Sequence, residues 1–288
     1  MTYLYSNAVC SIGYLLGAIL HFSGLFLLCK SKNDHPNQKI LIINLAVVEM
    51  LYCLSMVINI SVRLSRHVNT KILEIISEEF LSTLFLLEIR LTMLHIIFDR
   101  FLEIFTNIKY SLYMNRKAIL KIISMHWIIS FVNAIISCIL QHLPRESGYK
   151  RLLFTFSMCL VLDVMILVSS ITTYIYFYAI VRKIRGLEAS SAGQPEESRL
   201  DLLRKKFKLP CYIVITYICF NLTSTIMLTL SRYGKNWYIL NDLSPLPMII
   251  GVISDAFLYL FTNKSVRALL CSLCRKRISQ NRISGETL

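Results

Sequence analysis

The residues best suited to chemistry in this sequence are charged side chains inside otherwise apolar stretches. These residues are Glu49, Glu88, Arg90, Asp163 and Asp255. A charge at the centre of a bilayer costs about 2.5–3.5 kcal/mol on insertion scales, so such residues mark a functional or paired site. Hydrolytic chemistry is disfavoured because the sequence contains neither a GxSxG nor an HExxH motif. We therefore expect ion or proton binding, ion pairing or a conformational switch, and not an enzyme or a cofactor.

The elements that must position these charges are long apolar blocks. The chain has 288 residues, of which 55% are hydrophobic and 17% charged, whereas a soluble protein carries about 25% charged residues. Blocks of about 20 apolar residues are long enough to cross a membrane as helices. Seven such spans are predicted, at residues 8–29, 40–62, 80–105, 118–140, 152–181, 209–230 and 240–261. The predicted fold is an all-α membrane protein, a seven-transmembrane helix bundle that forms a single domain over residues 1–288.

Basic residues are distributed unequally between the two sides of this predicted bundle. With the amino terminus outside, 22 of the 31 Lys and Arg residues fall on the inner side and 8 in the outer segments. An excess of basic residues on the cytoplasmic side orients membrane proteins. The formal net charge of +14 is therefore interpreted as a topology signal and not as a nucleic-acid-binding surface.

We expect a multi-pass protein of the plasma membrane that contacts lipids, with an extracellular amino terminus and a cytoplasmic carboxy terminus. A cleaved signal peptide is disfavoured because no basic residue precedes Lys30.

Five short motifs lie in order along the predicted spans. They are Asn44-Leu45-Ala46-Val47-Val48-Glu49, Asp99-Arg100-Phe101, Trp127, Asp255-Ala256-Phe257-Leu258-Tyr259, and Asn263-Lys264-Ser265-Val266-Arg267 followed by Cys271. In this order the chain resembles the rhodopsin-like (class A) G-protein-coupled receptors over nearly its whole length. It resembles a divergent member, because the family's second-span Asp is replaced by Glu49, and the Asn and Pro of its NPxxY motif by Asp255 and Ala256.

The resemblance implies a receptor that transmits an extracellular stimulus to a heterotrimeric G protein. The residues that match the family's coupling switch are Asp99, Arg100, Phe101, Tyr174 and Tyr259, and the match to its aromatic toggle is Phe220. The resemblance also implies a short amphipathic eighth helix at residues 263–273, with Cys271 and Cys274 as candidate palmitoylation sites. A ligand of unknown chemistry is expected within the helix bundle, because the predicted outer segments are short.

Two other functions stay open at this point. Intramembrane acids could line the path of a transporter or channel, although no inverted repeat supports one. Alternatively, the chain could be a receptor-like fold that does not signal, since the family's prolines in the fifth and sixth spans align with Ile166 and Leu222.

The resemblance further places His21, Glu49 and Asp255 together, at positions that form a sodium pocket in the family. Two close carboxyl groups do not both ionise readily in a low dielectric. They could share a proton, hold Na⁺ or pair with a protonated His21. This cluster is interpreted either as a proton- or cation-sensitive switch or as a neutral, hydrogen-bonded packing network.

Glu88 and Arg90 are two residues apart on one predicted helix, so they do not face each other. Asp163 is the candidate partner of Arg90 because it is the only acidic residue in the fifth span. Ser130 or Asn133 could hydrogen-bond Glu88. Arg90 is therefore interpreted as half of an intramembrane ion pair with Asp163 or, alternatively, as the anchor of an acidic ligand.

Overall fold

The computed structural model describes residues 2–30, 36–65, 75–106, 110, 114–141, 148–188, 210–233, 243–262 and 272, and every regular element within them is helical. In chain order the elements are α1 (Thr2–Lys30), α2 (Pro36–Ser65), η2 (Ile75–Leu81), α4 (Ser82–Thr106), α6 (Arg116–Gln141), α7 (Gly148–Glu188), η5 (Tyr217–Leu222), α9 (Thr223–Tyr233) and α11 (Pro245–Thr262). Segments η2 and η5 are π-helical. The predicted all-helical fold is thereby confirmed. Of the predicted eighth helix at 263–273 only residue 272 is described, and both candidate palmitoylation sites lie outside the described residues.

Five of the helical segments are long and apolar enough to cross a membrane, and α11 contains a shorter apolar stretch at Pro245–Leu260. Helix α4 is not among the five. It carries Glu88 and Arg90 near its middle and Asp99, Arg100 and Glu103 near its carboxyl end. The bundle compensates by enclosing α4, so that Glu88, Arg90 and Asp99 are all buried.

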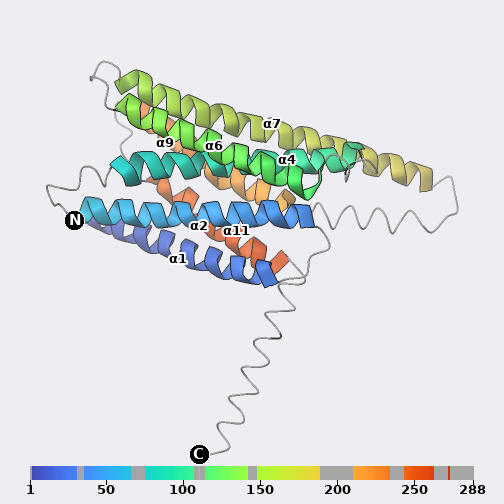
Figure 1. Ribbon diagram of the computed structural model, residues 1–288, viewed down its shortest axis with the longest axis horizontal. Helices are drawn as coiled ribbons and strands as arrows, with labels where there is room; N and C mark the ends of the chain where they lie inside the picture. Colours follow the sequence, from blue (N-terminus) through green and yellow to red (C-terminus); the bar gives the residue numbers. More distant parts are fainter. Residues whose placement is uncertain are drawn as a thin grey trace, which may run out of the picture.

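Helix α4 lies at the centre of the packing, in contact with α2, α6, α7 and η2. Helix α1 packs against α2 and α11, and α11 also contacts η5. The helices run side by side along the long axis of the molecule, and α7 extends beyond its neighbours (Figure 1). With 41 residues, α7 is roughly 60 Å long at about 1.5 Å per residue, twice the thickness of a hydrocarbon core.

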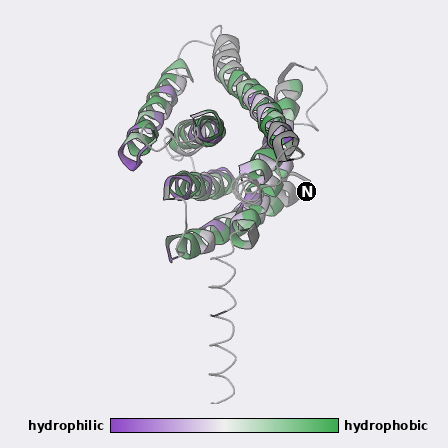
Figure 2. Cartoon of the chain, turned by 90° about the vertical axis from the view of Figure 1, so that its right-hand side faces the viewer, coloured by the Kyte–Doolittle hydropathy of each residue, from purple (hydrophilic) through white to green (hydrophobic). Residues whose placement is uncertain are grey.

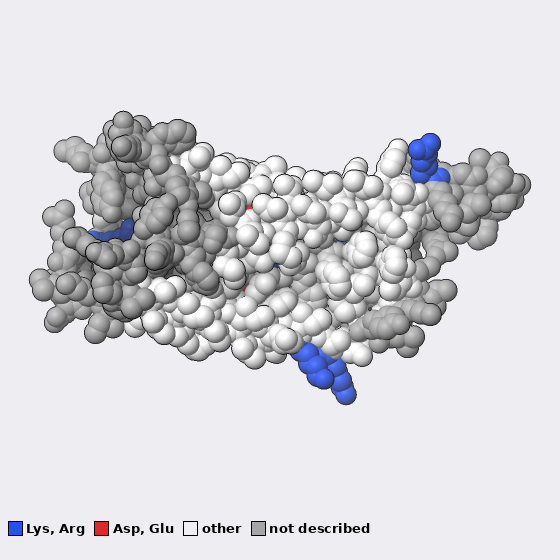
Figure 3. Space-filling view, turned by 90° about the horizontal axis from the view of Figure 1, so that it is seen from above, with Lys and Arg blue, Asp and Glu red and all other residues white. Residues whose placement is uncertain are grey.

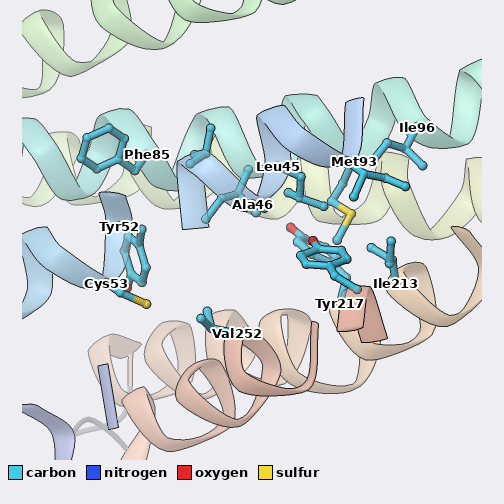
Figure 4. Close-up of a cluster of buried hydrophobic side chains, with 14 of the residues drawn as sticks. Leu45, Ala46, Tyr52, Cys53, Phe85, Met93, Ile96, Ile213, Tyr217 and Val252 are labelled. Carbon is cyan, nitrogen blue, oxygen red and sulfur yellow. The ribbon is translucent and has the colours of Figure 1, made fainter. Parts of the chain in front are cut away.

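Apolar side chains occupy both the interior and the outer surface of the bundle. The buried core lies between α2, α4, α11 and the segment that contains Ile213 and Tyr217 (Figure 4). Viewed along the helices, hydrophobic residues are present on every one of them (Figure 2). The middle of the face shown in Figure 3 is almost free of charged side chains. An apolar exterior of this kind is suited to contact with lipid tails.

The sixth predicted span contains a change of helix type. Residues 210–216 are α-helical, and the π-helical η5 separates them from α9. A π-helical turn marks a local disturbance of the α-helical hydrogen-bond register and occurs often at functional sites. It lies where the sequence has Leu222 in place of the family's proline. Helix α11 approaches η5 closely at Gly251, where an added Cβ would lie 2.9 Å from Phe220 Cβ.

Candidate functional site

A cluster around Arg100 lies at the carboxyl end of α4. Arg100 Nη2 donates to Asp99 Oδ2 and Nη1 donates to Glu103 Oε2. The Tyr110 hydroxyl donates to the second oxygen of Asp99. The Arg100 and Asp99 side chains are only 5% and 0% exposed. The guanidinium is thus neutralised by two carboxylates of its own helix, an arrangement that we call the Arg100 latch.

Tyr110 closes the Arg100 latch from beyond the end of α4. Burial raises the pKa of the Tyr110 hydroxyl above its ordinary value, and the negative charge of Asp99 raises it further. The hydroxyl therefore stays protonated at neutral pH and remains a hydrogen-bond donor. Asn37, at the start of α2, donates to the carbonyl of Met114, which ties the segment after α4 to α2.

The structure brings together only part of the set that matched the coupling switch. Phe101 lies beside the Arg100 latch, with its ring centroid 5.8 Å from that of Tyr176 on α7. Tyr174 is 63% exposed on the outer face of α7 and so points away from the bundle interior. Tyr259 is fully buried and belongs to a different cluster. Phe220 lies in η5, against Gly251 of α11.

The second cluster joins α1, α2 and α11 around Glu49. His21 Nε2 lies 2.9 Å from the carbonyl oxygen of Val252 and 3.5 Å from Glu49 Oε2. The Tyr259 hydroxyl donates to Glu49 Oε2 over 3.1 Å. The His21 and Tyr259 rings meet edge to face, with centroids 5.8 Å apart. His21, Glu49 and Tyr259 are all buried, so their contacts hold three helices together through one carboxyl group.

Asp255 extends this second cluster to the sixth span. Its Oδ1 accepts a hydrogen bond from Thr216 Oγ1, and its carboxyl group lies within electrostatic range of Glu49. Among the described residues, Asp255 Oδ2 has no hydrogen-bond partner. The three ionisable residues that the resemblance placed together are thus adjacent, and the Asp255 and Glu49 carboxyl groups lie close enough to share a proton or to hold a small cation between them. Within the described ranges, no group of three or more His, Cys, Asp or Glu side chains is arranged to hold a metal ion, and sodium binding stays a prediction.

The third cluster surrounds Arg90 in the middle of the bundle. Arg90 Nε donates to Asp163 Oδ1 over 2.9 Å, and Nη2 donates to Asp163 Oδ2 over 3.3 Å. Nη2 also donates to Thr225 Oγ1 over 2.9 Å, and Nη1 to the Leu86 carbonyl over 3.0 Å. The Tyr217 hydroxyl donates to Asp163 Oδ1. This bidentate pair links α4, α7 and the sixth span, and each charge is hydrogen-bonded as burial requires.

Glu88 faces the opposite side of α4, toward α2 and α6. Its Oε1 accepts hydrogen bonds from Asn44 Nδ2 and Thr92 Oγ1, each over 3.3 Å, and its Oε2 accepts one from Ser130 Oγ over 3.1 Å. Trp127 Nε1 donates to Asn44 Oδ1 over 3.2 Å. Two residues quoted only as motif members, Asn44 and Trp127, thus belong to one hydrogen-bond network.

Sequence reasoning did not find the partners contributed by the sixth span. Tyr217 and Thr225 complete the Arg90 cluster, and Thr216 pairs with Asp255. The sequence marks these three residues only by a hydroxyl group within an apolar span. Many Ser and Thr residues carry such a hydroxyl and bond it to the backbone of their own helix, so the hydroxyl alone does not identify a partner.

The all-helical bundle, its apolar exterior and its buried, paired charges define a multi-pass membrane protein with the architecture of a receptor. Residues 24–257 match the family of the 7 transmembrane receptor (rhodopsin family), and the chain belongs to this family. Comparison with curated proteins found no match. The chain is therefore a receptor of the G-protein-coupled type.

Proposed function

We propose that this receptor transmits an extracellular stimulus to a heterotrimeric G protein, and that opening of the Arg100 latch is the transmitting step. The observation that carries the proposal is the closed state of the latch, in which Arg100 is buried and held by Asp99 and Glu103. Among the described residues, the side-chain hydrogen bonds of Arg100 stay within α4. An arginine held in this way has a second stable arrangement once a partner protein offers it new acceptors.

The latch is of a strength that a binding event can overcome. A hydrogen bond to a charged group contributes about 1.5–3 kcal/mol net. Opening exchanges two such bonds of Arg100 for contacts with the partner, so the balance between the two states is a few kcal/mol. A ligand or partner with a similar difference in affinity for the two states shifts such an equilibrium.

The Glu49 cluster supports a second place at which movement of the sixth span can be controlled. Thr216 of the sixth span bonds Asp255 of α11, and Tyr259 of the same helix bonds Glu49. An outward movement of the sixth span has to break the contact between Thr216 and Asp255. Occupation of the free Asp255 oxygen by a proton or Na⁺ would change the stability of this contact, so ionic conditions are proposed to bias the receptor.

We place the receptor in the plasma membrane with its amino terminus outside, as the distribution of basic residues supports. The ligand is proposed to bind within the helix bundle. An epitope tag at the amino terminus tests the orientation, because it is accessible to antibody on intact cells only when the terminus is extracellular.

The function is tested with a panel of G-protein dissociation sensors in cells, comparing the native chain with Asp99→Asn and Arg100→Ala. Asp99→Asn removes one of the two charges that hold Arg100, so basal signalling is expected to rise. Arg100→Ala removes the contact itself, so signalling is expected to fall to the background, including when combined with Asp99→Asn. All variants are compared at equal surface level.

Arg116→Ala is the matched control, because it removes an exposed basic side chain at the start of α6. It is expected to signal like the native chain. A silent Asp99→Asn variant at normal surface level would overturn the proposal, as would equal signals from all five chains.

A further inference from the structure

A cavity of about 550 Å³ lies between α4, α6 and α7, apart from the three clusters described above. This volume falls within the range of about 300–1,000 Å³ that small-molecule sites occupy. Apolar side chains form most of its wall, among them Leu94 and Phe98 of α4, Ile122 of α6 and Met165 of α7. Among the described residues that line the cavity, none is Asp, Glu, Lys or Arg.

Two histidines form the main polar part of this wall. The rings of His95 on α4 and His126 on α6 meet edge to face, with centroids 5.2 Å apart. His95 is 4% exposed, and neither of its ring nitrogens has a hydrogen-bond partner among the described residues. The same holds for His126 Nδ1. Buried polar groups are normally hydrogen-bonded, so three unpaired ring nitrogens at a cavity wall indicate that a ligand supplies the missing partners.

The opposite wall adds weaker polar groups on α7. The hydroxyls of Thr172 and Thr173 donate to the carbonyls of Val168 and Ser169, over 2.8 and 2.7 Å. Each hydroxyl oxygen can still accept a hydrogen bond. The cavity is thus a mainly apolar space with the two histidines on one wall and weaker hydrogen-bonding groups on the other.

The unpaired nitrogens determine the chemistry of the head group that fits. A neutral imidazole offers one N–H donor and one acceptor nitrogen. A carboxyl group has two oxygens and, when protonated, one O–H, so it can satisfy two of the ring nitrogens at once. A single hydroxyl has to make both hydrogen bonds from one oxygen, whereas a carboxyl group presents its donor and its acceptor on two separate oxygens. A phosphate brings charge for which the lining has no Lys or Arg.

The outer rim of the cavity determines where the ligand comes from. Phe98, Met165 and Val168 line it and are 52%, 47% and 56% exposed. In a membrane-spanning bundle such exposed apolar side chains face the lipid tails. A ligand that enters past them must be soluble in the bilayer.

We propose that this cavity binds a long-chain fatty acid, with the protonated carboxyl group hydrogen-bonded to His95 and His126 and the chain along the apolar wall of α4 and α7. Phe101 also lines the cavity and directly follows Arg100 in the sequence. An occupied site therefore lies one residue from Arg100 of the latch. Binding itself is independent of G-protein coupling, and its test does not require a signal.

The test uses the full chain in phosphatidylcholine nanodiscs and a photoreactive palmitic acid that carries an alkyne handle. We expect labelled peptides from α4, α6 and α7, and competition by palmitic acid at a concentration at least tenfold lower than by hexadecanol or methyl palmitate. His95→Leu combined with His126→Leu is expected to weaken labelling at least tenfold. His95→Gln retains a donor and an acceptor and is expected to lose less than threefold.

Ser124→Leu is the matched control, because it makes the same change from polar to apolar on an exposed position of α6 outside the lining. It is expected to label like the native chain. Ser169→Phe fills the cavity without touching either histidine and is expected to block labelling, which keeps the test decisive if the double histidine variant does not fold. Equal labelling of the native and Ser169→Phe chains, or equal competition by palmitic acid and hexadecanol, would overturn the proposal.

Discussion

Replacing Asp163 by Ala tests whether the Arg90 cluster holds the bundle together. The substitution removes both acceptors of the bidentate pair and the acceptor of the Tyr217 hydroxyl. Among the described residues, it leaves Arg90 as a buried guanidinium with Thr225 and the Leu86 carbonyl as its remaining hydrogen-bond partners. A neutral hydroxyl and a carbonyl do not compensate the charge.

The expected loss follows from this geometry. Removing one partner of a buried ion pair costs about 3–5 kcal/mol, because the remaining charge is uncompensated. At 25 °C this lowers the ratio of folded to unfolded protein by roughly 150- to 5,000-fold. Asp163→Asn keeps an acceptor oxygen but not the charge, so we expect a loss in the lower part of the same range.

The assay measures surface level by flow cytometry and thermal unfolding of the purified receptor in detergent. Asp163→Ala is expected to reduce both strongly. The double variant Arg90→Met with Asp163→Leu is the decisive control, because apolar replacement of a whole buried pair is often neutral or stabilising. We expect it to recover most of the stability that Asp163→Ala loses.

Two results would refute this reasoning. Normal surface level and thermal stability of Asp163→Ala would mean that Arg90 is not half of a structural ion pair, and would favour a role as anchor for an acidic ligand. A double variant less stable than either single variant would mean that the pair contributes more than mutual neutralisation of two buried charges.

Three further outcomes are expected elsewhere in the bundle. Gly251→Ala places a Cβ 2.9 Å from Phe220 Cβ of the sixth span and should lower the free energy of unfolding by about 1–3 kcal/mol. At Gly24 an added Cβ meets no atom within 4 Å, so Gly24→Ala should be neutral or stabilising by up to about 1 kcal/mol. Ser130→Ala removes one hydrogen bond to Glu88 and should destabilise by about 1–2 kcal/mol in thermal unfolding; an unchanged melting temperature would argue against this contact. Tyr110→Phe removes a donor from the Arg100 latch and, at about 1.5 kcal/mol for that bond, should raise basal signalling up to roughly tenfold; a reduced signal at equal surface level would contradict the latch.

The sequence was sufficient to predict the helices and part of the buried chemistry. Apolar blocks long enough to span a bilayer predict helices because the backbone must bond internally in lipid. The high cost of an unpaired intramembrane charge made Asp163 the candidate partner of Arg90, and the structure brings the two together. The same reasoning offered Ser130 for Glu88, and Ser130 is the residue of the fourth span that donates to it.

The remaining contacts of the site depend on how each helix is rotated about its own axis. Hydropathy does not encode this rotation when every face of a helix is apolar. Motif matching included Tyr174 in the coupling switch, whereas the structure turns it outward at 63% exposure. Hydropathy likewise does not show that Tyr217 and Thr225 of the sixth span face Arg90 and Asp163, because that orientation depends on the π-helical segment η5, which begins at Tyr217 and ends before Thr225.

The π-helical segment η5 makes the sixth span sensitive to the length of the chain as well as to its composition. A π-helical turn holds extra backbone relative to an α-helix, so deleting one residue within Tyr217–Leu222 would restore the regular register. Every side chain beyond the deletion would then turn by about 100° relative to those before it. Thr225 would rotate away from Arg90 while Tyr217 stayed in place. Insertions and deletions at apolar positions of this segment therefore change the orientation of half of a helix while every polar residue is retained.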